Sequence, residues 1–352
     1  MKLEKSAQPA EEINTAVVRW RGGRILADGV LAAVVAEIYF NAKPEDRAEG
    51  KTARSRPGAD KPGPEKSGLE RSGSEKPGNM PWAYLRLPPF PQVAVRVMQL
   101  VMNENVQLHE LCDMVSSDAA FASEVLTVAN SALYAPRYPA SSILQAIAVL
   151  GADTLQGMCV TVGVRAYLGK TMSQPAMRAL WRHSLACGMI AQKLAAGGLV
   201  DEYTAYTAGI LHDIGRIALT VIQPKDYAAL LGSHHGSAES ILECERGLFG
   251  WDHCEAGLRL VSGWKLPQEF GEVVMDHHTQ RRTDGAWGLS ELVKMSCAIS
   301  DAAGYAAFAG CDAAAYSELL ERLPARERRI FYPEAGQLTR DIAAGISAIE
   351  TV

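Results

Sequence analysis

The chain has 352 residues, a formal net charge of −5 at pH 7 and 48% hydrophobic residues. The length suggests two domains, and the small net charge argues against a general nucleic-acid-binding surface. Seven cysteines are scattered without a C-x-x-C pair, so we expect buried free thiols in a cytoplasmic protein. We expect neither a signal peptide, because polar residues follow Met1, nor membrane contact, because the apolar stretch 30–40 contains Glu37 and is short.

The N-terminal part divides into two segments. For residues 1–42 we predict a small hairpin around 21–23 and one apolar helix, which either docks on the rest of the chain or binds a partner. Residues 43–79 are mostly charged residues, Gly, Pro, Ser and Ala, and a five-residue Glu-x-x-Gly repeat runs from 65 to 78. Such a segment buries too little apolar surface to offset its chain entropy, so we predict a disordered linker.

Residues 80–352 show helical apolar periodicity with no alternating strand pattern, which predicts an all-α domain. Ser and Asp at 116–118 and Ser at 141–142 are typical of helix starts, and Gly151 is typical of a helix end. Residues 80–172 have His109 as their only histidine and form a predicted packing lobe or protein-binding surface. Beyond it we predict helices at 176–196, 202–219, 227–231, 238–248, 256–261, 269–278 and 289–306, followed by C-terminal helices in 311–352.

The His212-Asp213 dipeptide, which ends an apolar run and precedes Gly215, is the first candidate for chemistry. Neighbouring helical residues point about 100° apart, so both side chains reach one ion only where the helix bends or ends, which Gly215 permits. Imidazole with carboxylate suits Mn, Fe, Zn or Mg rather than a thiol-binding metal.

Further candidate ligands are spread over the predicted helices. They are His183, His253, His277, His278 and Asp301. Each has a simpler explanation by itself, namely packing, helix capping or a solvated helix end. Together, inside a helical bundle, they would form a site for one or two divalent ions. We assign packing roles to Cys187 and Cys254, and none to His234 and His235, which lie in a Gly/Ser-flanked loop.

The order of these residues resembles the HD superfamily of metal-dependent phosphohydrolases. The surrounding segments 87–91, 125–132 and 141–151 (LPPFP, VLTVANSA and SSILQAIAVLG) resemble one branch, the HDOD domain of bacterial signalling proteins, and the resemblance covers about residues 83–305. It implies an HD-type helical bundle over 80–352, in which the packing lobe 80–172 and a metal lobe at 173–310 form one compact unit.

The resemblance also implies a division of the ligands. His183, His212, Asp213 and Asp301 would hold one ion, and His253, His277 and His278 would be candidates for a second. If the protein is an enzyme, Asp213 and Arg216 are the candidate catalytic residues. Active phosphodiesterase relatives often carry Lys at the position of Arg216, and the Gly-Tyr-Pro triplet of the cyclic-di-GMP phosphodiesterases is missing after His278.

Two hypotheses follow. The first is a non-catalytic signal-transduction module that binds signalling proteins and keeps its metal as a structural or sensing element. The alternative is a metal-dependent phosphohydrolase or phosphodiesterase acting on a nucleotide or cyclic nucleotide. One closed, fully ligated ion favours the first, and two ions with an open water position favour the second. A helical adaptor without metal is a third interpretation.

Overall fold

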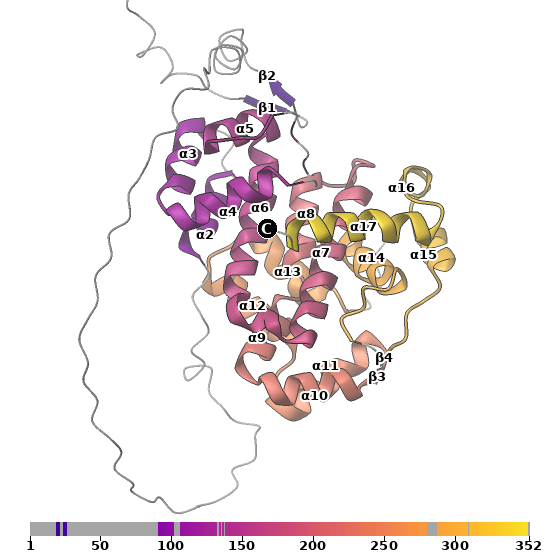
Figure 1. Cartoon of the computed structure of the whole chain (residues 1–352). Coiled ribbons are helices and arrows are strands. Elements are labelled where there is room, and N and C mark those ends of the chain that lie inside the picture. Colours follow the sequence, from indigo (N-terminus) through magenta and orange to yellow (C-terminus); the bar gives the residue numbers. More distant parts are fainter. Residues whose placement is uncertain are drawn as a thin grey trace, which may run out of the picture. The chain divides into compact units, whose positions relative to one another are not determined.

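The computed structural model describes residues 19–21, 24–26, 91–101, 106–131, 134, 136, 138–279, 287–308 and 310–350. Over these residues the chain is almost entirely helical (Figure 1), which confirms the predicted all-α class. The linker at 43–79 and the apolar helix expected before it lie outside the described residues. Strands β1 (Arg19–Arg21) and β2 (Arg24–Leu26) pair antiparallel, with Trp20 opposite Ile25, where the sequence suggests a hairpin.

The first part of the bundle is built around one central helix. Its helices are α2 (Gln92–Val101), α3 (Leu108–Ser116), α4 (Ala119–Ala129), α5 (Ile143–Leu150) and α6 (Ala152–Leu168). Helix α6 contacts α2, α4 and α5. Local capping sets the boundaries: Asp118 accepts hydrogen bonds from the backbone N–H groups of Ala120 and Phe121 at 3.0 and 3.1 Å. Gly151, at φ +88°, separates α5 from α6 in a conformation that other residues rarely adopt.

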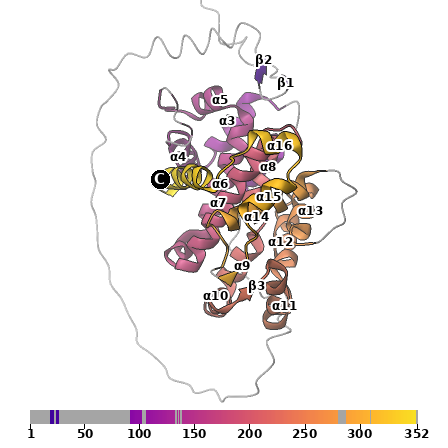
Figure 2. The same cartoon turned by 90° about the vertical axis from the view of Figure 1, so that its right-hand side faces the viewer.

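The remaining helices, α7 included, form the second part of the bundle. They are η4 (Gly169–Ser173, a 3₁₀ helix), α7 (Pro175–Ala195), α8 (Glu202–Leu211), α9 (Ile214–Ile222), α10 (Pro224–Ser233), α11 (Ala238–Phe249), α12 (His253–Gly263), α13 (Gln268–Asp276), α14 (Leu289–Ala302), α15 (Tyr316–Arg322), α16 (Ala325–Ile330) and α17 (Ala335–Glu350). Helix α7 contacts α8, α14, α16 and α17, and α8 and α14 also contact each other (Figure 2). It is therefore buried on most of its circumference, with Trp181 1% exposed.

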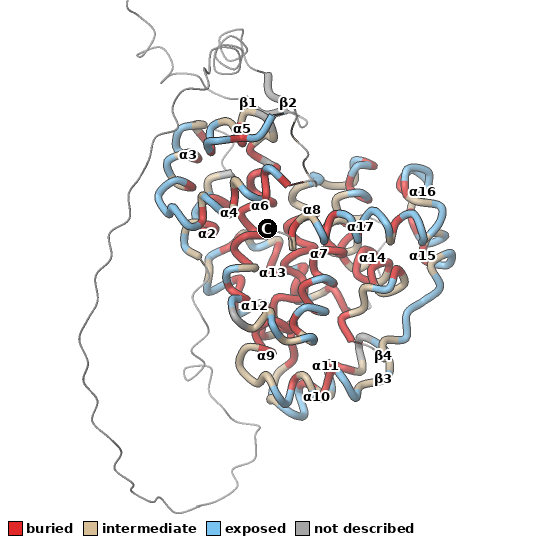
Figure 3. The backbone as a smooth tube through the Cα atoms, in the orientation of Figure 1, coloured by how far each residue is buried: buried red, intermediate tan, exposed pale blue. Residues whose placement is uncertain are grey.

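One hydrophobic cluster runs through both parts of the bundle, from Met98 on α2 through Trp181 on α7 to Ile346 on α17 (Figure 3). A smaller cluster around Tyr227 and Ile241 lies beneath α10 and α11. There, the two-residue strands β3 (His235–Gly236) and β4 (Gly310–Cys311) pair in parallel. In the described part of the chain, no helix is both long enough and apolar enough to span a membrane.

The predicted continuous helix 202–219 is wrong, because α8 ends at Leu211 and α9 begins at Ile214. The imidazole Nδ1 of His212 donates a hydrogen bond to the carbonyl oxygen of Gly209 at 2.7 Å, so a side chain satisfies the acceptor that the next helical N–H would use. Asp213 has φ −102° and ψ 18°, outside regular helix geometry. The break turns both side chains towards one centre, as expected from the dipeptide.

Gly215 has a different role from the one that the sequence suggests. Its φ angle is not positive, so the chain does not need glycine there to bend. Instead, a Cβ atom at this position would lie 1.8 Å from the carbonyl oxygen of His253 and 2.7 Å from the backbone nitrogen of Gly257. Glycine therefore allows α9 and α12 to approach closely, and this approach brings Asp213 beside His253.

Candidate metal centre

The structure brings the predicted ligands from five parts of the bundle to one place. His183 comes from α7, His212 and Asp213 from the break between α8 and α9, His253 from the first residue of α12, His277 and His278 from the end of α13, and Asp301 from α14. The four histidines His183, His212, His253 and His277 are at most 2% exposed, and His278 is 6% exposed. The side chain of Asp301 is 12% exposed.

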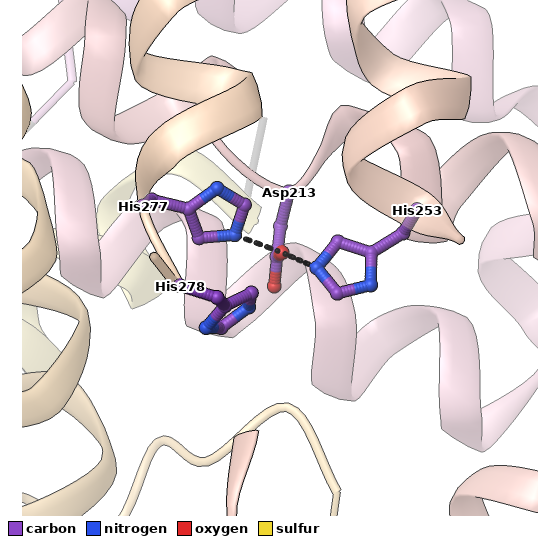
Figure 4. Close-up of side chains that lie close together, drawn as sticks. All are labelled: Asp213, His253, His277 and His278. Atoms are coloured by element: carbon purple, nitrogen blue, oxygen red, sulfur yellow. Dashed lines mark hydrogen bonds and ion pairs between the residues drawn. The ribbon is translucent and has the colours of Figure 1, made fainter. Parts of the chain in front are cut away.

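The carboxylate of Asp213 lies at the centre of this cluster. Its Oδ1 atom is 3.2 Å from His277 Nε2 and 3.4 Å from His253 Nε2 (Figure 4). Its Oδ2 atom is 3.6 Å from His183 Nε2 and 3.7 Å from His212 Nε2. Each carboxylate oxygen therefore faces one pair of histidines. A carboxylate in this arrangement could ligate an ion at either of two adjacent positions.

The opposite nitrogen, Nδ1, of each of these four rings has its own hydrogen-bond acceptor. The pairs are His183 with the Tyr305 carbonyl at 2.7 Å, His212 with the Gly209 carbonyl at 2.7 Å, His277 with the Val274 carbonyl at 2.8 Å, and His253 with Glu245 Oε2 at 2.6 Å. A backbone carbonyl only accepts, so the three rings that face one carry their hydrogen on Nδ1 and present the Nε2 lone pair to the centre. Metal-binding histidines are held in this way.

The donor atoms fit a divalent ion. His183 Nε2 and His212 Nε2 are 3.2 Å apart, so two lone pairs face each other with no proton between them in the neutral rings. Ligand atoms about 2.1 Å from a tetrahedral ion lie about 3.4 Å from one another, close to the separations among His183, His212 and Asp213. His253 Nε2 is buried without a hydrogen-bond partner within the described residues. A cation at the centre would satisfy these nitrogen atoms.

Arg216, on the first turn of α9, places a positive charge inside the cluster. Its Nε atom is 2.9 Å from Asp213 Oδ2, its Nη1 is 3.5 Å from Glu245 Oε1, and its Nη2 is 3.3 Å from His278 Nε2. Arg216 is 1% exposed, so this guanidinium is desolvated and its charge is balanced by the two carboxylates.

Glu245 is a functional candidate that the sequence analysis misses. It is fully buried on α11, accepts a hydrogen bond from the Tyr227 hydroxyl at 2.6 Å, and contacts both the backbone N–H and the ring of His253, at 2.9 and 2.6 Å. It thereby orients His253 and balances Arg216. A single Glu on an amphipathic helix carries no signal in the sequence, since burial of that helix face depends on packing.

Burial and charge set the protonation of the cluster in opposite directions at different residues. Burial lowers the pKa of His212 to about 3, so this ring is neutral. Burial and Arg216 also oppose a charge on His253, but the Glu245 carboxylate raises its pKa to about 10. Burial favours the protonated acid at Asp213, yet Arg216 and the surrounding histidines hold its pKa well below the usual range. The central carboxylate is therefore an ionised acceptor.

The structure separates Asp301 from the ring nitrogen that faces the centre. Asp301 Oδ1 is 3.4 Å from His183 Nδ1, whereas Cys297 Sγ is 3.6 Å from His183 Nε2. The donor atoms form two groups, and within each group all the atoms lie within 4.8 Å of one another. One group comes from Asp213, His253, His277 and His278, and the other from His183, His212 and Cys297. Cys297 was not predicted, although it precedes Asp301 by one helical turn and so shares its helix face.

His234 and His235, to which the sequence assigns no role, lie outside this centre. His234 Nε2 lies 3.0 Å from the Ser240 hydroxyl at the start of α11, and His235 belongs to β3. Cys187 and Cys254 are both buried. Cys187 Sγ is 3.9 Å from the Val293 carbonyl, as expected for a packed thiol.

Known proteins share this architecture. Residues 87–280 match the HDOD domain, which covers more than half of the chain, so the chain belongs to the HDOD domain family. An HDOD domain protein of unknown function from Geobacter sulfurreducens is 25% identical, with a TM-score of 0.60 and coverage of 76% of this chain and 92% of that one. A presumed signal transduction protein from Marinobacter aquaeolei is 21% identical, with a TM-score of 0.60 and coverage of 76% and 60%.

A curated relative extends the comparison. An uncharacterised protein from Treponema pallidum is 24% identical over 196 residues, which are 54% of this chain. The match spans 37% of the length of that relative.

Proposed function

We propose that this HDOD protein is a non-catalytic signalling module whose helical bundle carries one divalent ion as a structural or sensing element. The observation that carries the proposal is the buried ion pair between Arg216 and Asp213, 2.9 Å long. It joins a permanent positive charge to the carboxylate that two catalytic ions would share. The name of the Marinobacter aquaeolei protein, a presumed signal transduction protein, supports a role in signalling.

The charge of the cluster favours one ion over two. Asp213 and Glu245 contribute two negative charges, Arg216 contributes one positive charge, and His253, with a pKa of about 10, contributes another, so the cluster is left less positive by a single divalent ion than by two. A second divalent ion would leave a large positive charge inside a buried site, which is unfavourable in a medium of low dielectric constant. Arg216 also contacts His278 Nε2 at 3.3 Å, which directs that candidate ligand to the guanidinium.

The burial of the centre also favours a non-catalytic role. A phosphodiester substrate must contact the ions and the attacking water directly, which requires an open position among the ligands. The histidines and Asp213 are at most 6% exposed. An ion enclosed to this degree is typical of a structural site.

The alternative, a metal-dependent phosphohydrolase or phosphodiesterase for a nucleotide or cyclic nucleotide, is supported by one feature of the centre. The two oxygens of Asp213 face separate histidine pairs, as a carboxylate shared by two ions would. In that case His183 and His212 would hold one ion, and His253 and His277 the other. The ions would supply a water nucleophile and charge neutralisation at the phosphate.

Elemental mass spectrometry on protein purified without a metal-affinity tag tests both. We expect about one ion per chain in the wild type, almost none in Asp213→Ala, and no hydrolysis of bis(p-nitrophenyl) phosphate. An Arg216→Lys variant is measured alongside, because it keeps the positive charge but replaces the planar guanidinium by a point charge. Two ions per chain together with hydrolysis that Asp213→Ala abolishes would establish the enzyme. No metal after reconstitution with Mn, Fe or Zn would leave the helical adaptor.

A further inference from the structure

We infer that Cys297 is a direct ligand of the ion, in the place that the family resemblance assigns to Asp301. The inference rests on the proposed metal centre, and it adds a thiolate to a ligand set expected to contain only imidazole and carboxylate. The site formed by His183 Nε2, His212 Nε2 and Cys297 Sγ then favours Zn and Fe over Mg and Mn among the expected metals.

The sulfur atom lies at the distance that a shared ion requires. Ligands about 2.3 Å (sulfur) and 2.1 Å (nitrogen) from a tetrahedral ion are about 3.6 Å apart. Cys297 Sγ is 3.6 Å from His183 Nε2, and the donor atoms of Cys297, His183 and His212 all lie within 4.8 Å of one another. Cys297 is 7% exposed and its thiol points into the cluster rather than to solvent.

Asp301 contacts the other side of the same ring. Its Oδ1 is 3.4 Å from His183 Nδ1, beside the Tyr305 carbonyl that accepts from this nitrogen at 2.7 Å, and its Oδ2 accepts from the Cys311 thiol at 3.6 Å. The ring N–H donates to the Tyr305 carbonyl, and the nearby carboxylate of Asp301 adds a negative charge behind the ring, which increases the basicity of Nε2. Asp301 is therefore a positioning residue in the present arrangement.

A packing role for Cys297 is the competing explanation, and Cys187 shows what packing looks like in the same place. Cys187 lies one helical turn from His183 along α7, and it is buried. Its Sγ lies 3.9 Å from the Val293 carbonyl. Cys297, in contrast, faces a ring nitrogen whose lone pair is exposed to the centre, and its S–H donates to that nitrogen. A bound ion would displace the thiol proton to solvent, and the resulting thiolate would ligate the ion.

This ligand set changes the expected metal. Thiolate with imidazole favours Zn(II), Fe(II) or Co(II), whereas Mg(II) prefers oxygen ligands. The ion should therefore be lost to thiol-reactive oxidants as well as to chelators, because an oxidised Cys297 no longer binds it.

Cobalt spectroscopy on the metal-stripped full-length chain tests the assignment. We expect Co(II) to produce tetrahedral visible bands and a near-ultraviolet thiolate-to-cobalt charge-transfer band in the wild type. Cys297→Ser should remove the charge-transfer band, whereas the matched control Cys187→Ser should keep it. Asp301→Asn should also keep the band while weakening Co(II) affinity by roughly ten- to a hundredfold, the usual effect of losing an orienting partner.

The outcomes separate this inference from the function on which it rests. Cobalt that binds stoichiometrically without a charge-transfer band would exclude Cys297 and leave the proposed metal centre intact. No cobalt in the wild type, checked by elemental analysis, would overturn both. Should Cys297→Ser fail to fold, X-ray absorption of the wild type loaded with zinc decides the question alone: a sulfur shell supports the ligand, and a shell of only nitrogen and oxygen refutes it.

Discussion

Gly215→Ala is the substitution that most directly tests how the fold assembles the site. The added Cβ would lie 1.8 Å from the carbonyl oxygen of His253, and this neighbour is backbone that cannot rotate away. Helix α9 must therefore move away from α12 by more than an ångström to restore ordinary contact. Overpacking of this kind costs about 3 kcal/mol, the upper end of the usual range.

Two other glycines provide graded controls. At Gly257 a Cβ would lie 2.5 Å from Cγ1 of Val274, the end of a side chain, so Gly257→Ala should cost less, about 1 kcal/mol. At Gly247, on the exposed face of α11, nothing lies within 4 Å. Gly247→Ala should stabilise the protein by about 0.5–1 kcal/mol, because alanine loses less backbone entropy in a helix.

Thermal unfolding followed by circular dichroism measures the series. For a folded region of this size, about 1 kcal/mol shifts Tm by about 2–4 °C, so we expect Gly215→Ala to lower Tm by about 6–12 °C. Metal affinity should fall as well, because the same displacement separates Asp213 from His253. A Tm for Gly215→Ala equal to that of Gly247→Ala would refute the close approach of α9 and α12.

Three further predictions concern charge and capping. Glu245→Gln should destabilise the protein by about 3 kcal/mol in denaturant unfolding, because it leaves buried positive charge unbalanced, whereas Glu243→Gln on the exposed face of the same helix should have little effect. Metal-free protein should lose stability as the pH falls from about 6.5 towards 3. Burial lowers the pKa of His212 to about 3, so over this range the unfolded chain binds a proton that the folded chain does not. A His212→Gln variant should therefore show a shallower dependence of Tm on pH. His253 contributes with the opposite sign: burial lowers its pKa but Glu245 raises it to about 10, so its stabilisation is complete below about 6.5 and is lost towards pH 10. Asp118→Ala should cost about 1 kcal/mol, measured by the denaturant midpoint, since it removes the two hydrogen bonds that begin α4, and an unchanged midpoint would contradict the cap.

Features that depend on neighbouring residues could be predicted from the sequence. The helix starts after Asp118 and Ser142 and the helix end at Gly151 follow from local hydrogen bonds and backbone conformation. The interruption at His212-Asp213 was expected from the need to turn both side chains to one ion, yet the helix 202–219 was predicted as continuous. The apolar periodicity continues across the break and therefore does not predict it.

The domain boundaries at 42, 79 and 172 stay predictions. The linker lies outside the described residues, and one hydrophobic cluster passes through both proposed lobes without a boundary near 172. Composition identifies a segment that buries little apolar surface, but it does not show where packed helices divide.

By itself, the sequence determined the helical class, the order of the histidines and carboxylates along the chain, and the family that this order resembles. Only the tertiary structure decided that Glu245 balances Arg216, that Asp301 lies behind the His183 ring, and that Cys297 faces its Nε2 atom. Capping and periodicity are local properties, because they depend on residues that are close together in the sequence. The composition of the site depends instead on which faces of α7, α11 and α14 are buried, and this is set by packing between residues up to 122 positions apart in the chain.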